Sequence, residues 1–199
     1  MPYTNVMYRP KRAFTLIELI VVIAIIAILS ILVILSLYRI RANAKLSQLS
    51  DELSTIAKSV NLYADDNNYH FPQQPASLRG VPLGLEKYLV GGSWPVGPWK
   101  NGEFEWDTWP YTYHGTTTAV GVPAQYQPYL NQNVLQISYH LCPLNSASPA
   151  TDCIDPVLFP TFTQDSGIFY CIDGPCIPHQ DKPEIPGYCV NCKIKPVNY

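Results

Sequence analysis

The stretch FTLIELIVVIAIIAILSILVILSLY, Phe14 to Tyr38, decides the architecture of this chain. It carries one charged side chain, Glu18, and contains no proline or glycine. At about 1.5 Å per residue, a helix of this length covers roughly 37 Å, enough to cross a hydrocarbon core of about 30 Å. Few soluble helices are apolar on every face, so a buried core helix is disfavoured. We therefore predict a membrane-spanning helix over residues 14–38.

A secretory signal and a plain signal anchor are also apolar N-terminal segments. A cleaved secretory signal has a shorter apolar region that ends in small residues, and Tyr38 to Arg41 is a poor cleavage site. A plain signal anchor fits the length but does not account for Glu18. An ionisable group in a spanning helix costs about 2.5–3.5 kcal/mol at mid-membrane and less near the edge. Either Glu18 reaches the headgroups, or a positive charge arrives from elsewhere to pair with it.

Lys11 to Leu29, KRAFTLIELIVVIAIIAIL, resembles the class III signal of type IV prepilins and type II secretion pseudopilins. The resemblance implies that residues 1–13 are a leader, cut by a prepilin peptidase between Ala13 and Phe14, with N-methylation of the new N-terminal Phe14. The residue before the cut is usually Gly in that family, and Ala13 keeps it small. The positive charge of the leader comes from Arg9, Lys11 and Arg12.

The same resemblance gives Glu18 a role in assembly. In the family this residue pairs with the N-terminal amine of a neighbouring subunit, which here would be the amine of Phe14. Burying a carboxylate and an ammonium together costs far less than burying either alone. Many family members also carry a helix-kinking Pro that is absent here, so we expect a straighter helix.

Residues 39–67 continue the helix as an amphipathic segment. One face is apolar at spacings of three and four, and we expect it to pack on a sheet rather than in a coiled coil; it comprises Leu46, Leu49, Leu53, Ile56, Val60 and Tyr63. The opposite face carries Lys45, Gln48, Asp51, Glu52 and Lys58. The helix should end near Asp65 to Asn68, where the sequence favours turns. The following aromatic-Pro pair and Leu-rich segment resemble the linker of major pseudopilins, with a short helix or turn near Leu83 to Leu89.

We predict a small β-rich domain over residues 68–199. Prolines and glycines are concentrated beyond residue 70, so this region should be rich in loops and contain little helix. The first expected strand covers residues 103–108, after a hairpin turn at Lys100 to Gly102, because Phe104, Trp106 and Thr108 alternate with Glu103, Glu105 and Asp107. Further strands are expected at Asn133 to Leu141, Ser166 to Ile172 and Gly187 to Ile194. The aromatic segment Trp94 to Tyr113 either packs on the helix, which we favour, or forms a surface that stacks on sugars. The fold class is α+β: a long N-terminal helix on a small antiparallel sheet with a loop-rich, cysteine-stapled C-terminal region.

Six cysteines fall in the last third of the chain, at Cys142, Cys153, Cys171, Cys176, Cys189 and Cys192. Their even number, beyond a membrane helix, predicts three disulfides in an oxidising compartment. Pairing of sequence neighbours is one arrangement, and crossed pairing of the last four is equally open. A zinc site on those four thiolates and a redox pair at Cys189 and Cys192 are the less favoured alternatives.

No motif predicts catalysis or a bound cofactor. His70, His114, His140 and His179 are scattered and lie in no metal or triad motif. Asp152, Asp155 and Asp165 could contribute to a calcium loop, but their spacing is irregular, so we expect no metal. The formal net charge is −2, and loss of the leader makes it more negative, which argues against binding nucleic acid by bulk charge.

The function that the resemblance implies is structural. We expect a pilin or pseudopilin subunit with its N-terminus in the cytoplasm and a single pass through the cytoplasmic membrane before assembly. An ATPase and a platform protein would then extract it into an extracytoplasmic filament that serves adhesion, motility, DNA uptake or protein secretion. The alternative is a membrane-anchored module that never polymerises and uses its aromatic segment to bind carbohydrate or another surface.

Overall fold

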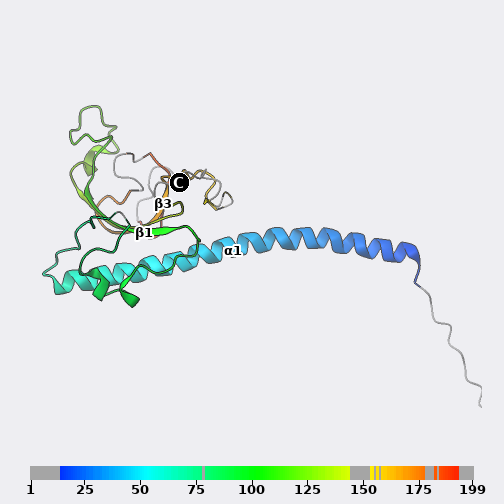
Figure 1. Ribbon diagram of the computed structural model, residues 1–199. Coiled ribbons are helices and arrows are strands. Elements are labelled where there is room, and N and C mark those ends of the chain that lie inside the picture. Colours follow the sequence, from blue (N-terminus) through cyan, green and yellow to red (C-terminus); the bar gives the residue numbers. More distant parts are fainter. Residues whose placement is uncertain are drawn as a thin grey trace, which may run out of the picture. The chain divides into compact units, whose positions relative to one another are not determined.

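A computed structural model describes residues 14–77, 79–143, 153–154, 156, 158–177, 182 and 184–192, without the side chains of Leu32 and Leu35. The chain divides into two compact units, one ending at Arg41 and one beginning at Ala42 (Figure 1). The described elements are one α-helix, α1 (Leu16–Asp66), three short 3₁₀ helices and four strands. The 3₁₀ helices are η1 (Leu85–Lys87), η2 (Val90–Gly92) and η3 (Gln127–Tyr129).

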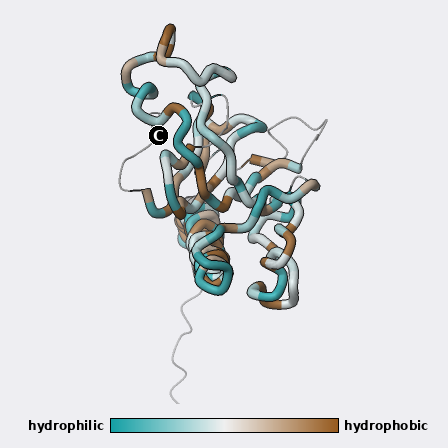
Figure 2. The backbone as a smooth tube through the Cα atoms, turned by 90° about the vertical axis from the view of Figure 1, so that its left-hand side faces the viewer, coloured by the Kyte–Doolittle hydropathy of each residue, from teal (hydrophilic) through white to brown (hydrophobic). Residues whose placement is uncertain are grey.

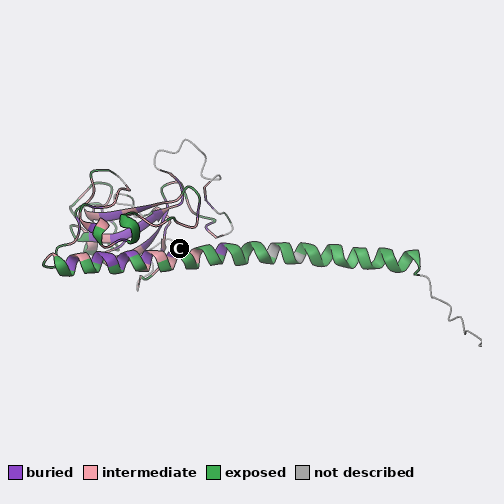
Figure 3. Cartoon of the chain, turned by 60° about the horizontal axis from the view of Figure 1, so that its bottom comes forward, coloured by how far each residue is buried: buried purple, intermediate pink, exposed green. Residues whose placement is uncertain are grey.

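The first unit contains the N-terminal part of α1. Its described side chains from Phe14 to Arg41 are all exposed (Figure 3). The helix is unbroken, as expected for a stretch without Pro or Gly, and the Ser30 hydroxyl donates to the Ile26 carbonyl at 2.7 Å. Among the described residues, α1 is the helix that is long and apolar enough to cross a membrane. No described residue of this unit buries its apolar surface.

In the second unit, the C-terminal part of α1 packs on the domain with the predicted stripe. Leu49, Leu53 and Val60 are fully buried, and Leu46 and Tyr63 flank them. Most of the polar face is exposed as predicted, although Glu52 is half-buried. The helix ends at Asp66, and the next turns use positive φ at Asn68 and Tyr69, consistent with the predicted stop.

The sheet has the order β1-β2-β3-β4, formed by β1 (Glu103–Pro110), β2 (Asn133–His140), β3 (Gly167–Asp173) and β4 (Tyr188–Cys189). The first three strands are antiparallel, with Trp106 opposite Ile137 and Ile137 opposite Tyr170. The expectation of a wholly antiparallel sheet is wrong at β4, which runs parallel to β3. The chain crosses over between these strands, so the sheet is mixed.

The expected hairpin at Lys100 to Gly102 is also wrong. The Gly102 amide donates to the Trp99 carbonyl at 3.0 Å, so a turn forms, but residues 94–99 before it form no strand. Position 102 requires glycine for a reason other than a hairpin, because a Cβ there would lie 2.0 Å from the Tyr139 hydroxyl oxygen. The turn therefore serves to bring the backbone close to a buried tyrosine.

Aromatic side chains fill the core between α1 and the sheet. Trp106 and Tyr139 are fully buried, and Phe104 contacts Tyr139 with ring centroids 4.7 Å apart. The Trp106 indole N–H donates to the Pro72 carbonyl at 2.8 Å, and the Tyr139 hydroxyl donates to the Trp99 carbonyl at 3.1 Å. These contacts confirm that most of the aromatic segment builds the core.

All six cysteines are paired with their sequence neighbours: Cys142 with Cys153, Cys171 with Cys176, and Cys189 with Cys192. The crossed arrangement and the four-thiolate zinc site are therefore wrong, because every sulfur is committed to a disulfide. Cys176 and Cys189 are buried with Phe169 in a small cluster on the sheet. The bridges hold loops against a domain that has few regular elements.

Candidate assembly site at the start of the apolar helix

The N-terminus of α1 is closed by a reciprocal pair of side chains, Thr15 and Glu18. The Thr15 backbone N–H and hydroxyl donate to Glu18 Oε2 at 2.8 and 2.7 Å. The Glu18 backbone N–H donates to the Thr15 hydroxyl oxygen at 3.3 Å. This is a capping box, in which the residue before the helix and its third residue satisfy each other's backbone groups.

The capping box places a carboxylate at the positive end of the helix dipole. The Thr15-x-x-Glu18 spacing is the sequence signal for this cap, whereas the expectations for Glu18 concerned only its cost in a membrane and its pairing with an amine. Both donations from Thr15 reach the same oxygen, Oε2. A carboxylate can accept about four hydrogen bonds in total, so this one retains capacity for a further donor.

Phe14 lies immediately before this capped turn and is 76% exposed. It therefore lies one residue from Thr15 and four residues from Glu18, at the very start of the helix. Ala13 and the leader residues Arg9, Lys11 and Arg12 lie outside the described residues. The structure thus shows the carboxylate side of the predicted site and the position of Phe14.

Residues 8–34 match the family model of the prokaryotic N-terminal methylation motif. The chain carries the class III prepilin signal of type IV pilins and pseudopilins. The match covers the basic leader, the Ala13–Phe14 junction and most of the apolar helix. Neither the curated proteins nor the solved structures include a match to this chain.

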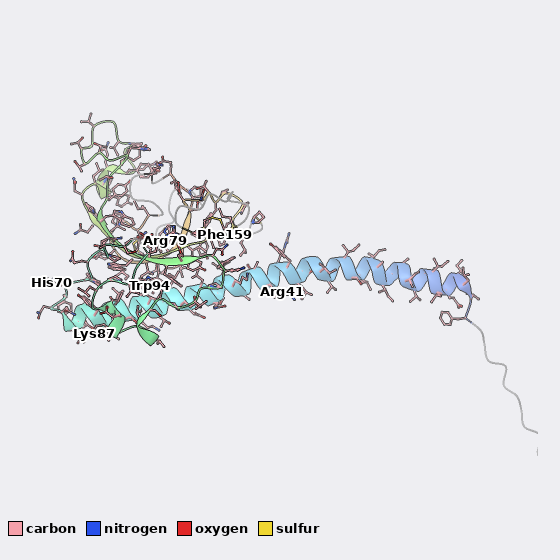
Figure 4. The ribbon with its side chains drawn as sticks, viewed as in Figure 1. Arg41, His70, Arg79, Lys87, Trp94 and Phe159 are labelled. Atoms are coloured by element: carbon pink, nitrogen blue, oxygen red, sulfur yellow. A yellow bond between two sulfur atoms is a disulfide. The ribbon has the colours of Figure 1, made fainter. Side chains whose placement is uncertain are left out.

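Outside the prepilin signal, a cluster of charged side chains joins a loop to the sheet. Arg79 Nη1 donates to the Glu103 carboxylate and, at 2.9 Å, to the Cys142 carbonyl (Figure 4). Arg79 Nε lies 3.7 Å from Glu105 Oε2, and His140 Nε2 lies 3.3 Å from the same oxygen. The cluster ties residue 79, strand β1 and the first disulfide together, which is a structural role.

A second polar network is buried on the face of the sheet opposite α1. Gln136 Nε2 donates to Asp107 Oδ2 at 3.0 Å, and Ser138 donates to the same carboxylate. Gln136 also makes two bonds to the backbone of Ile177, at 2.8 and 3.0 Å. Burial, and then the nearby Glu105 charge, raise the pKa of Asp107 well above its usual range. The network fixes the segment after the Cys171–Cys176 bridge to the sheet.

The other His and Asp residues considered as metal ligands or catalytic groups do not come together in one site within the described residues. His70 is exposed, and His114 Nε2 lies 3.3 Å from Glu184 Oε1. Asp165 is exposed, whereas Asp152, Asp155 and His179 lie outside the described residues. Within the described part of the chain, no three His, Cys, Asp or Glu side chains are grouped to hold a metal ion. The prepilin signal is the strongest candidate site that this chain offers.

Proposed function

We propose that this chain is a pilin or pseudopilin subunit that polymerises through its apolar helix into an extracytoplasmic filament. The observation that carries the proposal is the prepilin signal at residues 8–34, continuous with an apolar helix whose described side chains are all exposed. In a bilayer, lipid covers that surface. In a filament, copies of the same helix would cover it, which is a self-complementary use of one element.

Processing and assembly are linked chemically at Phe14. Cleavage after Ala13 would create an ammonium group at Phe14, and the Glu18 carboxylate retains room for such a donor. An N–H⁺ donor to a carboxylate forms a charge-assisted bond, roughly twice as strong as a neutral one. We therefore propose that the amine of one copy binds Glu18 of the next and sets the register of the apolar helices.

The proposed path begins in the cytoplasmic membrane with the leader in the cytoplasm. A prepilin peptidase would process the chain there, and an ATPase with a platform protein would move it into the filament. The rival function, a non-polymerising module that stacks on carbohydrate, depended on exposed aromatic side chains. Trp99, Phe104, Trp106 and Tyr111 are instead buried, so this rival has lost its main support.

Substitution of Glu18 tests the proposal. The Glu18→Ala chain should reach the membrane at wild-type abundance and be processed, yet yield no sheared filament. Ser30→Ala is the matched control, because Ser30 is a polar residue of the same helix whose hydroxyl donates to its own helix backbone. Normal filaments from Glu18→Ala, quantified by electron microscopy and immunoblotting of the sheared fraction, would show that the pairing role is wrong.

A further inference from the structure

A groove of about 410 Å³ lies between α1 and residues 89–95 within the second unit. Its apolar walls come from Ile56, Leu89, Val90 and Pro95. The Ser59 hydroxyl donates to the Tyr88 carbonyl at 2.9 Å and so holds the loop against the helix. The loop wall continues through Gly91 and Gly92 at φ +75° and +69°. The groove is therefore a formed feature between a rigid helix and an anchored loop.

The charged residues that line this groove are both acidic. Asp51 and Glu52 both line it, and none of its lining residues is basic. Gln48 Nε2 donates to Glu52 Oε1 at 2.7 Å, but Glu52 Oε2 is shielded from solvent and has no hydrogen-bond partner among the described residues. Leaving a buried carboxylate oxygen without a donor is costly. Because its charged lining residues are acidic and Ile56, Leu89, Val90 and Pro95 add apolar surface, the groove suits a cationic group carried on an apolar stem.

Apolar side chains at and beside this groove are exposed. Val90 is 93% exposed, and Val96 just beyond the lining is 91% exposed. Figure 2 shows that other loops of the chain also carry apolar residues, drawn in brown, at their tips. Two carboxylates beside apolar side chains match an arginine better than a lysine, because the guanidinium offers five donors on a stem that packs on apolar surface.

The chain itself carries such a segment. Arg39 and Arg41 are exposed on α1 with the 61% exposed Ile40 between them, and neither forms an ion pair within the described residues. Arg41 is labelled on the helix in Figure 4. Lys45 differs, because its ammonium lies 5.7 Å from the ring centre of Trp99. The arginine segment precedes the groove residues by about ten positions in the sequence. A second copy of the chain therefore offers both an arginine segment and a groove.

We propose that the groove formed by α1 and residues 89–95 binds the Arg39–Arg41 segment of a second copy of this chain. The inference rests on the proposed filament and adds a second, domain-level contact to it. Asp51 and Glu52 would receive the guanidinium groups, and Val90 would contact the aliphatic stems and Ile40. The contact is electrostatic and directional, so it would fix which copies are neighbours as well as strengthen their association.

A photo-crosslinking amino acid at Val90, in the full-length chain in its own membrane, tests the contact. The expected product is a covalent dimer of the chain whose linked peptide contains residues 39–41. Arg39→Glu with Arg41→Glu should reduce that adduct and the sheared filament by about tenfold or more, since close interfacial charges carry large coupling energies. Adding Asp51→Arg to Arg41→Glu should recover part of the loss. Lys58→Glu, a charge change elsewhere on α1, should leave the yield of the adduct and the amount of sheared filament unchanged.

The outcomes separate this contact from the filament itself. Normal filaments from the double Arg variant, an adduct to another segment or protein, or no adduct at Val90 would overturn the groove contact while leaving the filament proposal standing. A wild-type chain that is processed but never polymerises would contradict the filament proposal. In that case a Val90 adduct to residues 39–41 would still support the pairing of two copies, and its absence would overturn it.

Discussion

At the scale of single residues, the two carboxylates that matter most are in opposite environments. Glu18 is exposed at a helix N-terminus and capped by Thr15, whereas Asp107 is 2% exposed among Gln136 and Ser138. Sequence reasoning found Glu18, because a charge in an apolar stretch is conspicuous. It missed Asp107, because a carboxylate on the strand face opposite Phe104 and Trp106 is ordinarily exposed to solvent. The second face of the sheet is covered instead by the segment that ends at Ile177.

The raised pKa of Asp107 predicts a specific dependence of stability on pH. The folded state holds the proton more tightly than the unfolded state, so unfolding releases it. The free energy of unfolding should therefore fall as pH rises from about 4, the ordinary Asp pKa, through the folded-state pKa. Asp107→Asn should flatten this dependence while keeping both accepted hydrogen bonds. Denaturant unfolding of the full chain in detergent at several pH values measures it.

The control for that prediction is Asp107→Leu. It removes the acceptor of the Ser138 hydroxyl, whereas Gln136 Nε2 keeps the Ile177 carbonyl at 2.8 Å and the Ser138 hydroxyl oxygen at 3.2 Å as acceptors. About 1–3 kcal/mol should therefore be lost for the buried Ser138 donor. If Asp107→Asn kept the wild-type pH dependence, another group would be responsible for it.

At the scale of elements, the sequence predicted the regular structure well and its pairing less well. The stripe from Leu46 to Tyr63 and strand β1 lie where their periodicity put them. Strands β2 and β3 lie within one residue of the ranges expected for them, because each is a run of strand-forming residues long enough to recognise. The strand expected at Gly187 to Ile194 is present only as the two-residue β4, and its parallel pairing with β3 was not predicted, since a loop with few local signals positions it. The disulfide pairing was open for the same reason: spacing alone does not choose between connectivities.

Substitutions of side chains buried between α1 and the sheet should cause the largest losses of stability. Leu53 is fully buried in the core, so Leu53→Ala should lower the free energy of unfolding by about 2–5 kcal/mol. Leu62, on the same helix but 56% exposed, is the matched control, and Leu62→Ala should change it by about 0.5 kcal/mol or less. Similar losses for both variants, measured by denaturant unfolding, would mean that packing between α1 and the sheet does not hold the domain.

The three disulfides should contribute in order of loop length. Chain-entropy reasoning assigns about 3 kcal/mol to Cys142–Cys153, with a separation of 11, and about 2 kcal/mol each to the shorter bridges, with separations of 5 and 3. Paired Cys→Ser substitutions, one bridge at a time, followed by thermal unfolding, test the ranking. A larger loss on removing Cys189–Cys192 than on removing Cys142–Cys153 would contradict it.

At the scale of the whole molecule, the chain combines an apolar helix that carries a prepilin signal with a disulfide-stapled domain. The signal indicated the class of protein from the sequence alone, because it is local and chemically constrained. The groove at residues 89–95 could not be predicted, since it depends on how a loop of irregular structure is anchored to α1. The proposed filament therefore has one contact at the Phe14 amine and a second at the domain.

The mass and N-terminal sequence of the mature protein test the central claim most directly. We expect protein purified from membranes or sheared filaments to begin at Phe14 and to carry an N-methyl group on that residue. A matched Ala13→Glu chain, with a bulky charge before the junction, should accumulate uncut. A mature wild-type protein that still begins at Met1, or that has been cleaved after the apolar helix, would contradict the claim.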